Sequence, residues 1–331
     1  KCVPSLRHIE AQILRDTHGN TRVIGIRDCS VQRNNQKLME ESGSTLLSET
    51  LRSEVLESAA RIADAVDYIG AGTVEFIYDV PSDAIYFMEM NTRLQVEHPV
   101  TEAVTGVDIV KQQFAIASGA SLEAIEYEES GYALEVRINA EKAAVGADGS
   151  VTFIPTPGLM TVCELPEQED IELISMAGEG KTVSPFYDSL IVQIIAHGAD
   201  RADTVAKMLA YFDRIKINGI STNISLIKRV LKDEVFLSGD YDTTFLANFL
   251  ERTDVPSLIE DIERVSGSSA NVIDLDMLRI ENSQELKVLS PSSGVFFRTP
   301  SPSEPEYVSV GDQVTVGDTL CVLEAMKMFT S

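Results

Sequence analysis

Apolar residues recur at helical spacing in one segment of the first hundred residues. The segment runs from residue 49 to residue 68, and Gly70 follows it. Apolar positions three or four residues apart are typical of an amphipathic helix that packs one face on a core. We therefore predict a helix over 49–68 with core positions at Leu51, Val55, Ala59, Ile62 and Val66.

Two runs of strand-forming residues follow this helix. Residues 73–78 and 84–90 are separated by Pro-Ser-Asp at 81–83, a typical turn sequence. They predict a hairpin in which Glu75 and Glu89 face each other. Two carboxylates in direct opposition repel, and a hard divalent cation such as Mg²⁺ removes the repulsion, with Asn91 adding an amide oxygen nearby. The alternative is a pair of solvated glutamates on an edge hairpin.

Polar residues alternate directly after the hairpin. In an extended chain, alternate residues lie on one face, so a cation, an amide and a carboxylate come together there. Such a set can hold a small oxyanion, orient it and remove a proton. Because Pro99 restricts His98 to extended geometry, we expect no helix before residue 101. The three alternating residues are Arg93, Gln95 and Glu97.

The remaining pattern predicts an alternation of strands and helices up to residue 253. Residues 1–102 read as strands around the single helix, and residues 254–286 as one helix followed by a flexible Ser-Gly-Ser-Ser linker. Between them, residues 103–253 begin with helical segments, continue with strands at 132–139 and 189–197, and end with helices near 202–215, 222–232 and 243–251.

The last part of the chain predicts a small all-β module. Short strands at 288–297, 307–314 and 318–323 are separated by Gly, Pro and Asp turns. Lys327 follows between Met326 and Met328, at the expected tip of a hairpin. Its amine would lie in water, within reach of a modifying enzyme.

Composition narrows the class of protein. The chain has 331 residues, of which 44% are hydrophobic, enough for two or three domains. No apolar run approaches the roughly 20 residues of a membrane span, and the net charge of -25 opposes binding to nucleic acid or an anionic membrane. The cysteines have no paired metal spacing and predict reduced thiols in an intracellular protein. They are Cys2, Cys29, Cys163 and Cys321.

Residues 89–102 read Glu-Met-Asn-Thr-Arg-Leu-Gln-Val-Glu-His-Pro-Val-Thr-Glu. This stretch resembles the signature of the biotin carboxylase component of biotin-dependent carboxylases, an ATP-grasp enzyme. Residues 324–328 are similar to the biotin attachment site of the same family, and residues 299–305 resemble the thumb insertion of acetyl-CoA carboxylase carriers. Shorter similar stretches lie at 7–10, 18–20, 27–33, 70–76, 135–141 and 187–190.

The resemblance implies an α+β fold that ends in an all-β barrel. We expect a fragment of a longer polypeptide, inactive by itself, that lacks the start of the ATP-grasp region and the second half of the barrel. Its expected parts are the C-terminal portion of an ATP-grasp domain (1–102), the biotin carboxylase C-terminal domain (103–253), a linker (254–286) and a partial biotinyl, lipoyl-like barrel (287–331).

The resemblance also implies roles for single residues, with biotin, ATP and Mg²⁺ (or Mn²⁺) as cofactors. The expected metal ligands are Glu75, Glu89 and Asn91, and the residues expected around bicarbonate are Lys37, Arg93, Gln95, Val96 and Glu97. Glu97 is the expected general base, Arg137 the donor to the ureido oxygen of biotin, and Lys327 the attachment site. His8 and Gln32 are expected near ATP.

Four positions depart from the family pattern. Asn35 replaces a histidine that normally contacts the nucleotide, which makes nucleotide affinity the property in question. Ile26 stands where glutamate is common, Tyr132 where histidine is frequent, and Gln193 where the strand usually carries a lysine. None of these changes removes a residue with an expected catalytic role.

The expected reaction is ATP- and bicarbonate-dependent carboxylation of biotin in an acetyl-CoA carboxylase. Propionyl-CoA, pyruvate and urea carboxylases share these modules, so the acceptor stays open. Two other hypotheses are a different ATP-grasp ligase in which Lys327 is incidental, and a noncatalytic carrier or assembly fragment. Expected partners are a carboxyltransferase, a biotin protein ligase and a second copy of the chain, in the cytoplasm or in an organelle matrix.

Overall fold

The computed structural model describes residues 3–123, 125–145, 151–266, 295–301, 304–315, 318–326 and 328–330. Its first elements are β1 (Leu6–Arg15), β2 (Thr21–Arg33), β3 (Gln36–Ser42), α1 (Glu49–Ala65), β4 (Gly70–Asp79), a short 3₁₀ turn (Val80–Ser82), β5 (Ala84–Asn91), α2 (His98–Thr105) and α3 (Ile109–Ala117).

The elements that follow are β6 (Tyr132–Asn139), β7 (Glu141–Val145), β8 (Val151–Pro155), β9 (Gly158–Leu159), β10 (Val162–Glu164), β11 (Ile171–Ser175), β12 (Thr182–Val183), β13 (Leu190–Gly198), α4 (Arg201–Phe212), β14 (Lys216–Asn218), α5 (Ile224–Val230), α6 (Glu234–Ser238), α7 (Phe245–Glu251) and α8 (Val255–Ser266). The chain then forms β15 (Val295–Phe297), β16 (Val322–Ala325) and β17 (Met328–Thr330).

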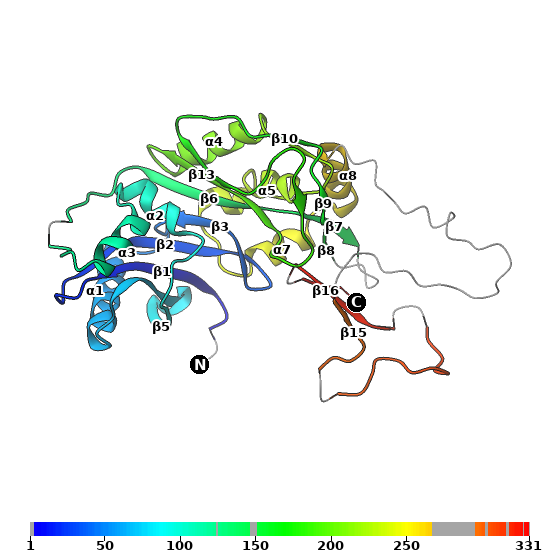
Figure 1. Ribbon diagram of the computed structural model, residues 1–331, viewed down its shortest axis with the longest axis horizontal. Helices are drawn as coiled ribbons and strands as arrows, with labels where there is room; N and C mark the ends of the chain where they lie inside the picture. Colours follow the sequence, from blue (N-terminus) through cyan, green and yellow to red (C-terminus); the bar gives the residue numbers. More distant parts are fainter. Residues whose placement is uncertain are drawn as a thin grey trace.

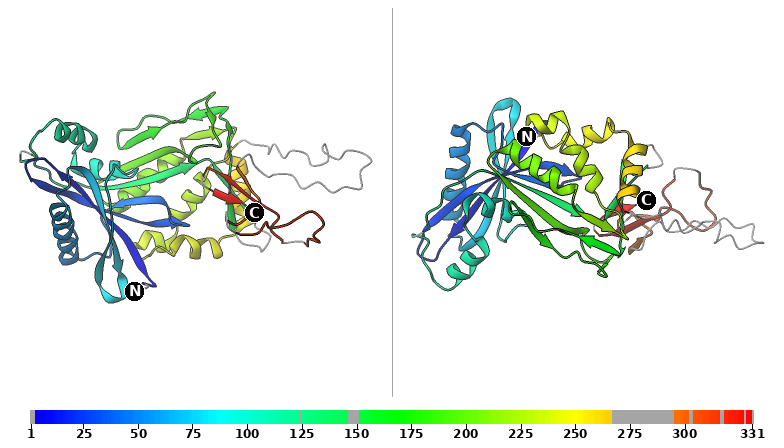
Figure 2. Two further views of the ribbon diagram at one scale, coloured as in Figure 1. Left: turned by 60° about the horizontal axis from the view of Figure 1, so that its bottom comes forward. Right: turned by 90° about the horizontal axis from the view of Figure 1, so that it is seen from above.

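One eight-stranded sheet organises the molecule, in the order β11-β13-β6-β3-β2-β1-β4-β5 (Figure 1). Every neighbouring pair in it is antiparallel. The sheet continues across residue 102, because β3 pairs with β6. Helices pack on both of its faces (Figure 2).

Helix α1 forms as the apolar spacing predicts, but it ends three residues early. The Ser48 side chain caps it by accepting a hydrogen bond from the Leu51 N–H. Leu51, Val55 and Ala59 are buried, and Ile62 packs against the same core. Val66 lies one residue beyond the helix and is 61% exposed, so its predicted place in the core is wrong.

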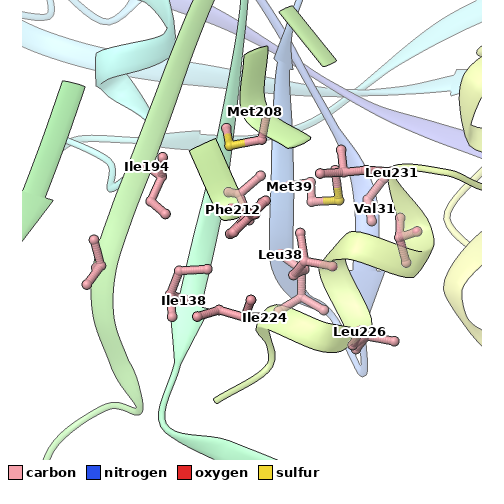
Figure 3. Packing of buried hydrophobic residues seen from close by; sticks show 14 of the residues in the cluster. Val31, Leu38, Met39, Ile138, Ile194, Met208, Phe212, Ile224, Leu226 and Leu231 are labelled. Atoms are coloured by element: carbon pink, nitrogen blue, oxygen red, sulfur yellow. The ribbon is translucent and has the colours of Figure 1, made fainter. Parts of the chain in front are cut away.

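Strand alternation divides β6 between a core face and a polar face. Leu134, Val136 and Ile138 are fully buried in the largest apolar cluster, and helix α4 packs on this face of the strand. Figure 3 shows Ile138 of β6 within this cluster, among residues that include Phe212 and Ile224. Glu135 and Arg137 point to the opposite face, because neighbouring residues of a strand alternate. The strand therefore carries charge on one side and core on the other.

Helix α2 begins at His98, three residues before the predicted position. Pro99 lies in its first turn, where a residue without an N–H is tolerated since that group has no partner within the helix. The expectation that Pro99 would keep His98 extended is therefore wrong. The early start brings Glu97 to the N-cap position.

The C-terminal part is a three-stranded sheet of order β15-β16-β17. The strand predicted at 307–314 is absent: Ser309 N–H donates to Asp312 Oδ2 at 2.8 Å in a turn, and Val310 is fully exposed. The strand predicted at 318–323 begins only at Val322. Predicted positions 288–294 and 267–286 lie outside the described residues.

Three of the four cysteines lie among the described residues. Cys29, Cys163 and Cys321 are free thiols, and Cys2 lies outside the described residues. Within the described ranges, every helix is too short or too polar to cross a lipid bilayer.

Replacing a core isoleucine of β13 tests the packing of the sheet. Ile194 is fully buried, so Ile194→Ala should lower the free energy of unfolding by about 2–5 kcal/mol through lost contacts and a cavity. Ile174 on β11 is 40% exposed and provides the matched control. Urea unfolding measures both variants, and equal destabilisation would contradict the assigned packing.

Candidate active site

A row of charged side chains crosses four neighbouring strands. Glu89 on β5 pairs with Glu75 on β4, Glu75 pairs with Glu10 on β1, and Glu10 pairs with Arg27 on β2. Directly paired residues of antiparallel strands share a face of the sheet. The predicted opposition of Glu75 and Glu89 is confirmed, and the structure extends it inward to two fully buried charges.

Arg27 forms the inner end of this row. Its Nε and Nη2 atoms donate to Glu10 Oε2 at 3.2 and 3.1 Å. Its Nη1 atom donates to Gln12 Oε1 and Thr101 Oγ1, each at 2.9 Å. Because Thr101 belongs to α2, the guanidinium fixes that helix to the sheet.

Lys37 on β3 lies over the row and contacts three carboxylates. Its Nζ atom donates to Glu10, to Glu97 Oε1 at 2.6 Å and to Glu75 Oε1 at 3.3 Å. Burial opposes charge on both Lys37 and Glu10. The neighbouring acidic groups nevertheless raise the pKa of Lys37, while Lys37 and then Arg27 lower the pKa of Glu10. Both groups are therefore charged at neutral pH.

Glu75 receives donors from several directions. Gln95 Nε2 donates to its Oε1 atom at 2.7 Å, and His8 Nε2 lies 3.0 Å from its Oε2 atom. Burial alone would raise the pKa of Glu75, but the contacts with His8 and Lys37 lower it to about 2. The carboxylate is therefore held ionised at the centre of the row.

Asn91 bridges the two outer carboxylates. Its Nδ2 atom donates at 3.0 Å to Glu75 Oε1 and to Glu89 Oε1. Turning the amide about its last bond presents an oxygen to the same position. Two carboxylates and an amide oxygen form a set of hard ligands that suits Mg²⁺. These three residues can hold a divalent cation.

The segment between β5 and α2 is a loop and not the predicted extended strand. It buries Gln95 and Glu97, while Arg93 is exposed and donates to the Leu94 carbonyl at 3.3 Å. The Val96 carbonyl accepts a hydrogen bond from Gln193 Nε2 at 2.8 Å. The loop thus brings the three alternating residues to one cleft without strand geometry.

Glu97 lies between two cations from different strands. Lys37 Nζ is 2.6 Å from its Oε1 atom, and Arg137 Nη2 is 2.9 Å from its Oε2 atom. Burial opposes the charge of Arg137, but Glu40 and Glu97 raise its pKa above the ordinary value. One carboxylate therefore joins a lysine of β3 to an arginine of β6.

These side chains line a cleft of about 340 Å³. Gln32 does not line the cleft, but its Nε2 atom lies 2.8 Å from Nδ1 of His8, which does. Lys327 lies outside the described residues. The predicted residues on the wall are His8, Lys37, Glu75, Glu89, Asn91, Arg93, Gln95, Val96, Glu97 and Arg137.

The sequence interpretation missed the buried charges beneath the cleft. Glu10, Arg27, Glu40 and Glu135 all lie within apolar strands and are fully buried. The signal that could have found them is a charged residue at every second position of a strand that is apolar on its other face. That pattern marks a polar face that another part of the chain covers.

Four residues depart from the family pattern, and the structure gives a physical reason here for three of them. Asn35 forms the β2–β3 turn with Asn34, both with positive φ, a conformation that asparagine adopts more readily than most residues. Ile26 is buried in the core under α1. The Tyr132 hydroxyl donates to Glu41 Oε2 at 2.7 Å.

Removing the Lys37 charge tests how the row is stabilised. Lys37→Met should cost about 3–5 kcal/mol at pH 7, because Glu10 loses a buried partner. The loss should shrink when the pH is lowered to 3, below the ordinary glutamate pKa of 4.5, because the unfolded Glu10 is then protonated and the pair contributes less stability. Lys228→Met, which removes an exposed pair with Asp213, should cost at most about 1 kcal/mol. Thermal unfolding at the two pH values measures the stability lost in each variant. Equal losses in Lys37→Met and Lys228→Met at pH 7 would contradict the role assigned to Lys37.

Three protein families match consecutive parts of this chain. Residues 1–125 match the family described as "Carbamoyl-phosphate synthase L chain, ATP binding domain". Residues 135–248 match "Biotin carboxylase C-terminal domain", and residues 286–331 match "Biotin-requiring enzyme". Their order agrees with the resemblance drawn from the motifs.

Individual relatives cover most of the chain. Biotin carboxylase 1 of Bacillus subtilis is 44% identical over 253 residues, which are 75% of this chain and 54% of that protein. The biotin-dependent acyl-coenzyme A carboxylase alpha3 subunit of Mycobacterium leprae is 35% identical over 361 aligned positions, 97% of this chain and 59% of that protein.

A solved structure extends the likeness to the fold. The biotin carboxylase domain dimer of Hydrogenobacter thermophilus 2-oxoglutarate carboxylase, in complex with MgADP, ADP and bicarbonate, has a TM-score of 0.70 and 37% identity. The match covers 78% of this chain and 55% of that one. The chain therefore spans little more than half the length of these relatives. It belongs to the biotin-dependent carboxylase family and joins part of a biotin carboxylase to a biotin carrier region.

Proposed function

We propose that this chain supplies the residues that carboxylate biotin at the expense of ATP and bicarbonate, as part of a larger carboxylase. The position of Glu97 carries the proposal: one carboxylate contacts Lys37 on one side and Arg137 on the other, within a single cleft. The family matches and the ligands named for the solved relative support the same reaction.

The outer carboxylates would hold Mg²⁺ together with ATP. Glu75, Glu89 and Asn91 offer oxygen ligands at the open side of the cleft, and their negative charge suits a divalent ion. Bound there, Mg²⁺ would neutralise phosphate charge during transfer. His8 and Gln32, which contact each other beside Glu75, are the proposed neighbours of the nucleotide.

Bicarbonate would bind between Lys37 and the loop. Lys37 and Arg93 supply positive charge to the anion, and Gln95 with the Val96 backbone orients it. Glu97 would take the bicarbonate proton, which makes the oxygen a better nucleophile towards the terminal phosphate of ATP. The product, carboxyphosphate, has the leaving group that bicarbonate lacks.

Biotin would enter on the Arg137 side. Its ureido nitrogen is a weak nucleophile until negative charge on the ureido oxygen is stabilised, and Arg137 is the permanently charged donor proposed for that oxygen. Because Arg137 and Lys37 share Glu97, the CO₂ released from carboxyphosphate would form close to the ureido nitrogen.

Lys327 is the proposed carrier of biotin, and a biotin protein ligase would attach it. A carboxyltransferase would receive the carboxyl group. The thumb-like residues 299–305 favour acetyl-CoA as the acceptor, although the relatives include both an acyl-CoA and a 2-oxoglutarate carboxylase. A second copy of the chain is a further proposed partner, as in the dimeric relative.

Changes of Glu97 and of Arg137 in the full-length carboxylase should impair different steps of the reaction. Glu97→Gln should lower bicarbonate-dependent ATP cleavage by about 10²–10⁴-fold, because the base is lost. Arg137→Ala should spare most of that cleavage but lower carboxybiotin formation by about 10²–10³-fold. Phosphate release and carboxybiotin are measured together.

A suitable control for these variants is Arg252→Ala, which removes an exposed ion pair with Asp233 far along the chain from the cleft residues. It should leave both rates unchanged. If Arg137→Ala kept ATP cleavage and carboxybiotin formation coupled as in the parent, the role proposed for Arg137 would be wrong.

Biotin should be found on Lys327 when the full-length protein is expressed with a biotin ligase, because residues 324–328 resemble a biotin attachment site and Met326 lies in a turn directly after β16. Lys327→Arg should abolish incorporation, measured by mass spectrometry and avidin blotting. Biotin on a different lysine, with Lys327 unmodified, would refute the assignment and favour a ligase in which Lys327 is incidental.

A further inference from the structure

Two buried glutamates face each other behind Arg137. Glu40 on β3 and Glu135 on β6 are direct partners across the two strands, and neither is exposed to solvent. Glu135 and Arg137 are two residues apart, so they share a face of β6. The pair therefore borders the proposed biotin side of the cleft through Arg137, although neither glutamate lines the cleft itself.

The two carboxyl groups have few donors among the described residues. Glu40 Oε1 lies 2.7 Å from Arg137 Nη2 as an ion pair, but neither Glu40 oxygen receives a well-directed hydrogen bond. Glu135 Oε1 accepts one from Gln193 Nε2 at 3.0 Å, and Glu135 Oε2 accepts none. The four oxygens thus share one amide donor and two ion-pair contacts with the same Arg137 guanidinium, at 2.7 and 4.0 Å, which is too little for two buried anions.

The charges around the pair do not balance if every acid is ionised. Within the described part of the chain, the polar cluster at the cleft floor holds five carboxylates and only three permanent cations. The carboxylates are Glu10, Glu40, Glu75, Glu97 and Glu135, and the cations are Arg27, Lys37 and Arg137.

Gln193 explains why the pair has no second cation beside Arg137 among the described residues. Its position on β13 is directly opposite Arg137, and the family resemblance places a lysine there. A lysine would supply positive charge beside Glu135, whereas the Gln193 amide is neutral and also serves the Val96 carbonyl. This chain needs another way to compensate the second carboxyl group.

We propose that Glu135 is a neutral carboxylic acid that donates its proton to Glu40 as a hydrogen bond, and that the singly charged pair positions Arg137. The proton then does the work that a lysine does elsewhere. Glu40 stays the anionic partner of Arg137, while the otherwise unbonded Glu135 Oε2 and a Glu40 oxygen satisfy each other. Both glutamates are positioning residues for the reaction proposed above, and only this positioning role rests on that proposed function.

The local electrostatics support this assignment of the proton. Burial raises the pKa of both acids, and the Glu40 charge raises that of Glu135 further. Arg137 is the largest opposing influence on Glu40, which favours the ionised form there. The other charged groups acting on the pair are Glu97, Lys37 and Glu10.

The stability of the 331-residue chain as a function of pH tests the proton. A neutral Glu135 keeps a proton that the unfolded chain releases above its ordinary pKa of 4.5. The parent should therefore lose stability as the pH rises from 5 to 8, by up to about tenfold in the unfolding constant per pH unit. Glu135→Gln mimics the neutral acid and lacks this loss, so it should become the more stable protein towards pH 8.

Glu141→Gln is the matched control. Glu141 is equally buried but has a cationic partner, because it accepts two hydrogen bonds from the Arg33 guanidinium at 2.6 Å. Its replacement should destabilise the chain at pH 8, because it removes the bidentate partner of Arg33. If Glu135→Gln is destabilising at pH 8 as Glu141→Gln is, Glu135 is an anion and the proposal fails.

Gln193→Lys provides a second test that does not depend on one variant folding. The added cation should let Glu135 ionise, which flattens the decline of stability from pH 5 to 8. In this background Glu135→Gln should change sign and become destabilising, since it removes the partner of the new charge. An unchanged pH slope in Gln193→Lys would overturn the proposal.

Activity in the full-length carboxylase tests the positioning role. Glu135→Gln should keep ATP cleavage coupled to carboxybiotin formation, whereas Glu40→Gln should lower carboxybiotin formation about a hundredfold with ATP cleavage largely kept, because Arg137 loses its anchor. Coupling that survives in Glu40→Gln would overturn this role. Absence of bicarbonate-dependent ATP cleavage in the parent would instead refute the proposed function and leave the proton test standing.

Discussion

The placement of Lys37 among three carboxylates is the interaction on which the cleft depends. Strand pairing alone brings Glu89, Glu75 and Glu10 into one row, and like charges at that spacing repel. Arg27 compensates the inner end of the row and Lys37 compensates it from above. The lysine is thereby both a structural counter-ion and a charge directed at the open cleft.

The same interaction joins the two halves of the proposed reaction. Lys37 and Arg137 come from β3 and β6, which are neighbours in the sheet, and Glu97 contacts both. Backbone hydrogen bonds between those strands, together with the Glu40–Arg137 ion pair, set the separation of the two cations. Charge and backbone geometry therefore support one another at the place where bicarbonate and biotin would meet.

Local patterns in the sequence predicted the hairpin and much of the cleft. The turn at 81–83 sets the register of β4 and β5 as far as the pair Phe76–Phe87, and a one-residue irregularity between Phe76 and Glu75 then places Glu75 opposite Glu89. The hairpin therefore follows from the sequence pattern, whereas the exact pairing of the two glutamates depends on this irregularity. The extension of the row to Glu10 and Arg27 could not be predicted in this way, because their partners lie on strands distant in the sequence. Burial of a charge is a property of the whole sheet.

Other differences between the sequence predictions and the structure arise where local preferences of the chain compete with its three-dimensional contacts. Pro99 disfavours a helical conformation of His98 when only the two residues are considered, but the first turn of a helix accepts proline and α2 begins at His98. Residues 307–314 have strand-forming composition, but the Asp312 side chain accepts a hydrogen bond from the Ser309 N–H there, which favours a turn. Asn34 and Asn35 adopt the positive φ of a tight hairpin, so the departure at Asn35 has a role in chain reversal.

The alternation along β6 has a consequence for how this family can change during evolution. A strand has a repeat of two, so an insertion or deletion of one residue before Leu134 would exchange its two faces. Arg137 would turn into the apolar core, and leucine or valine would replace it above the cleft. Substitutions such as Gln193 can accumulate one at a time, but the length of this strand cannot drift by a single residue without loss of both the core and the chemistry.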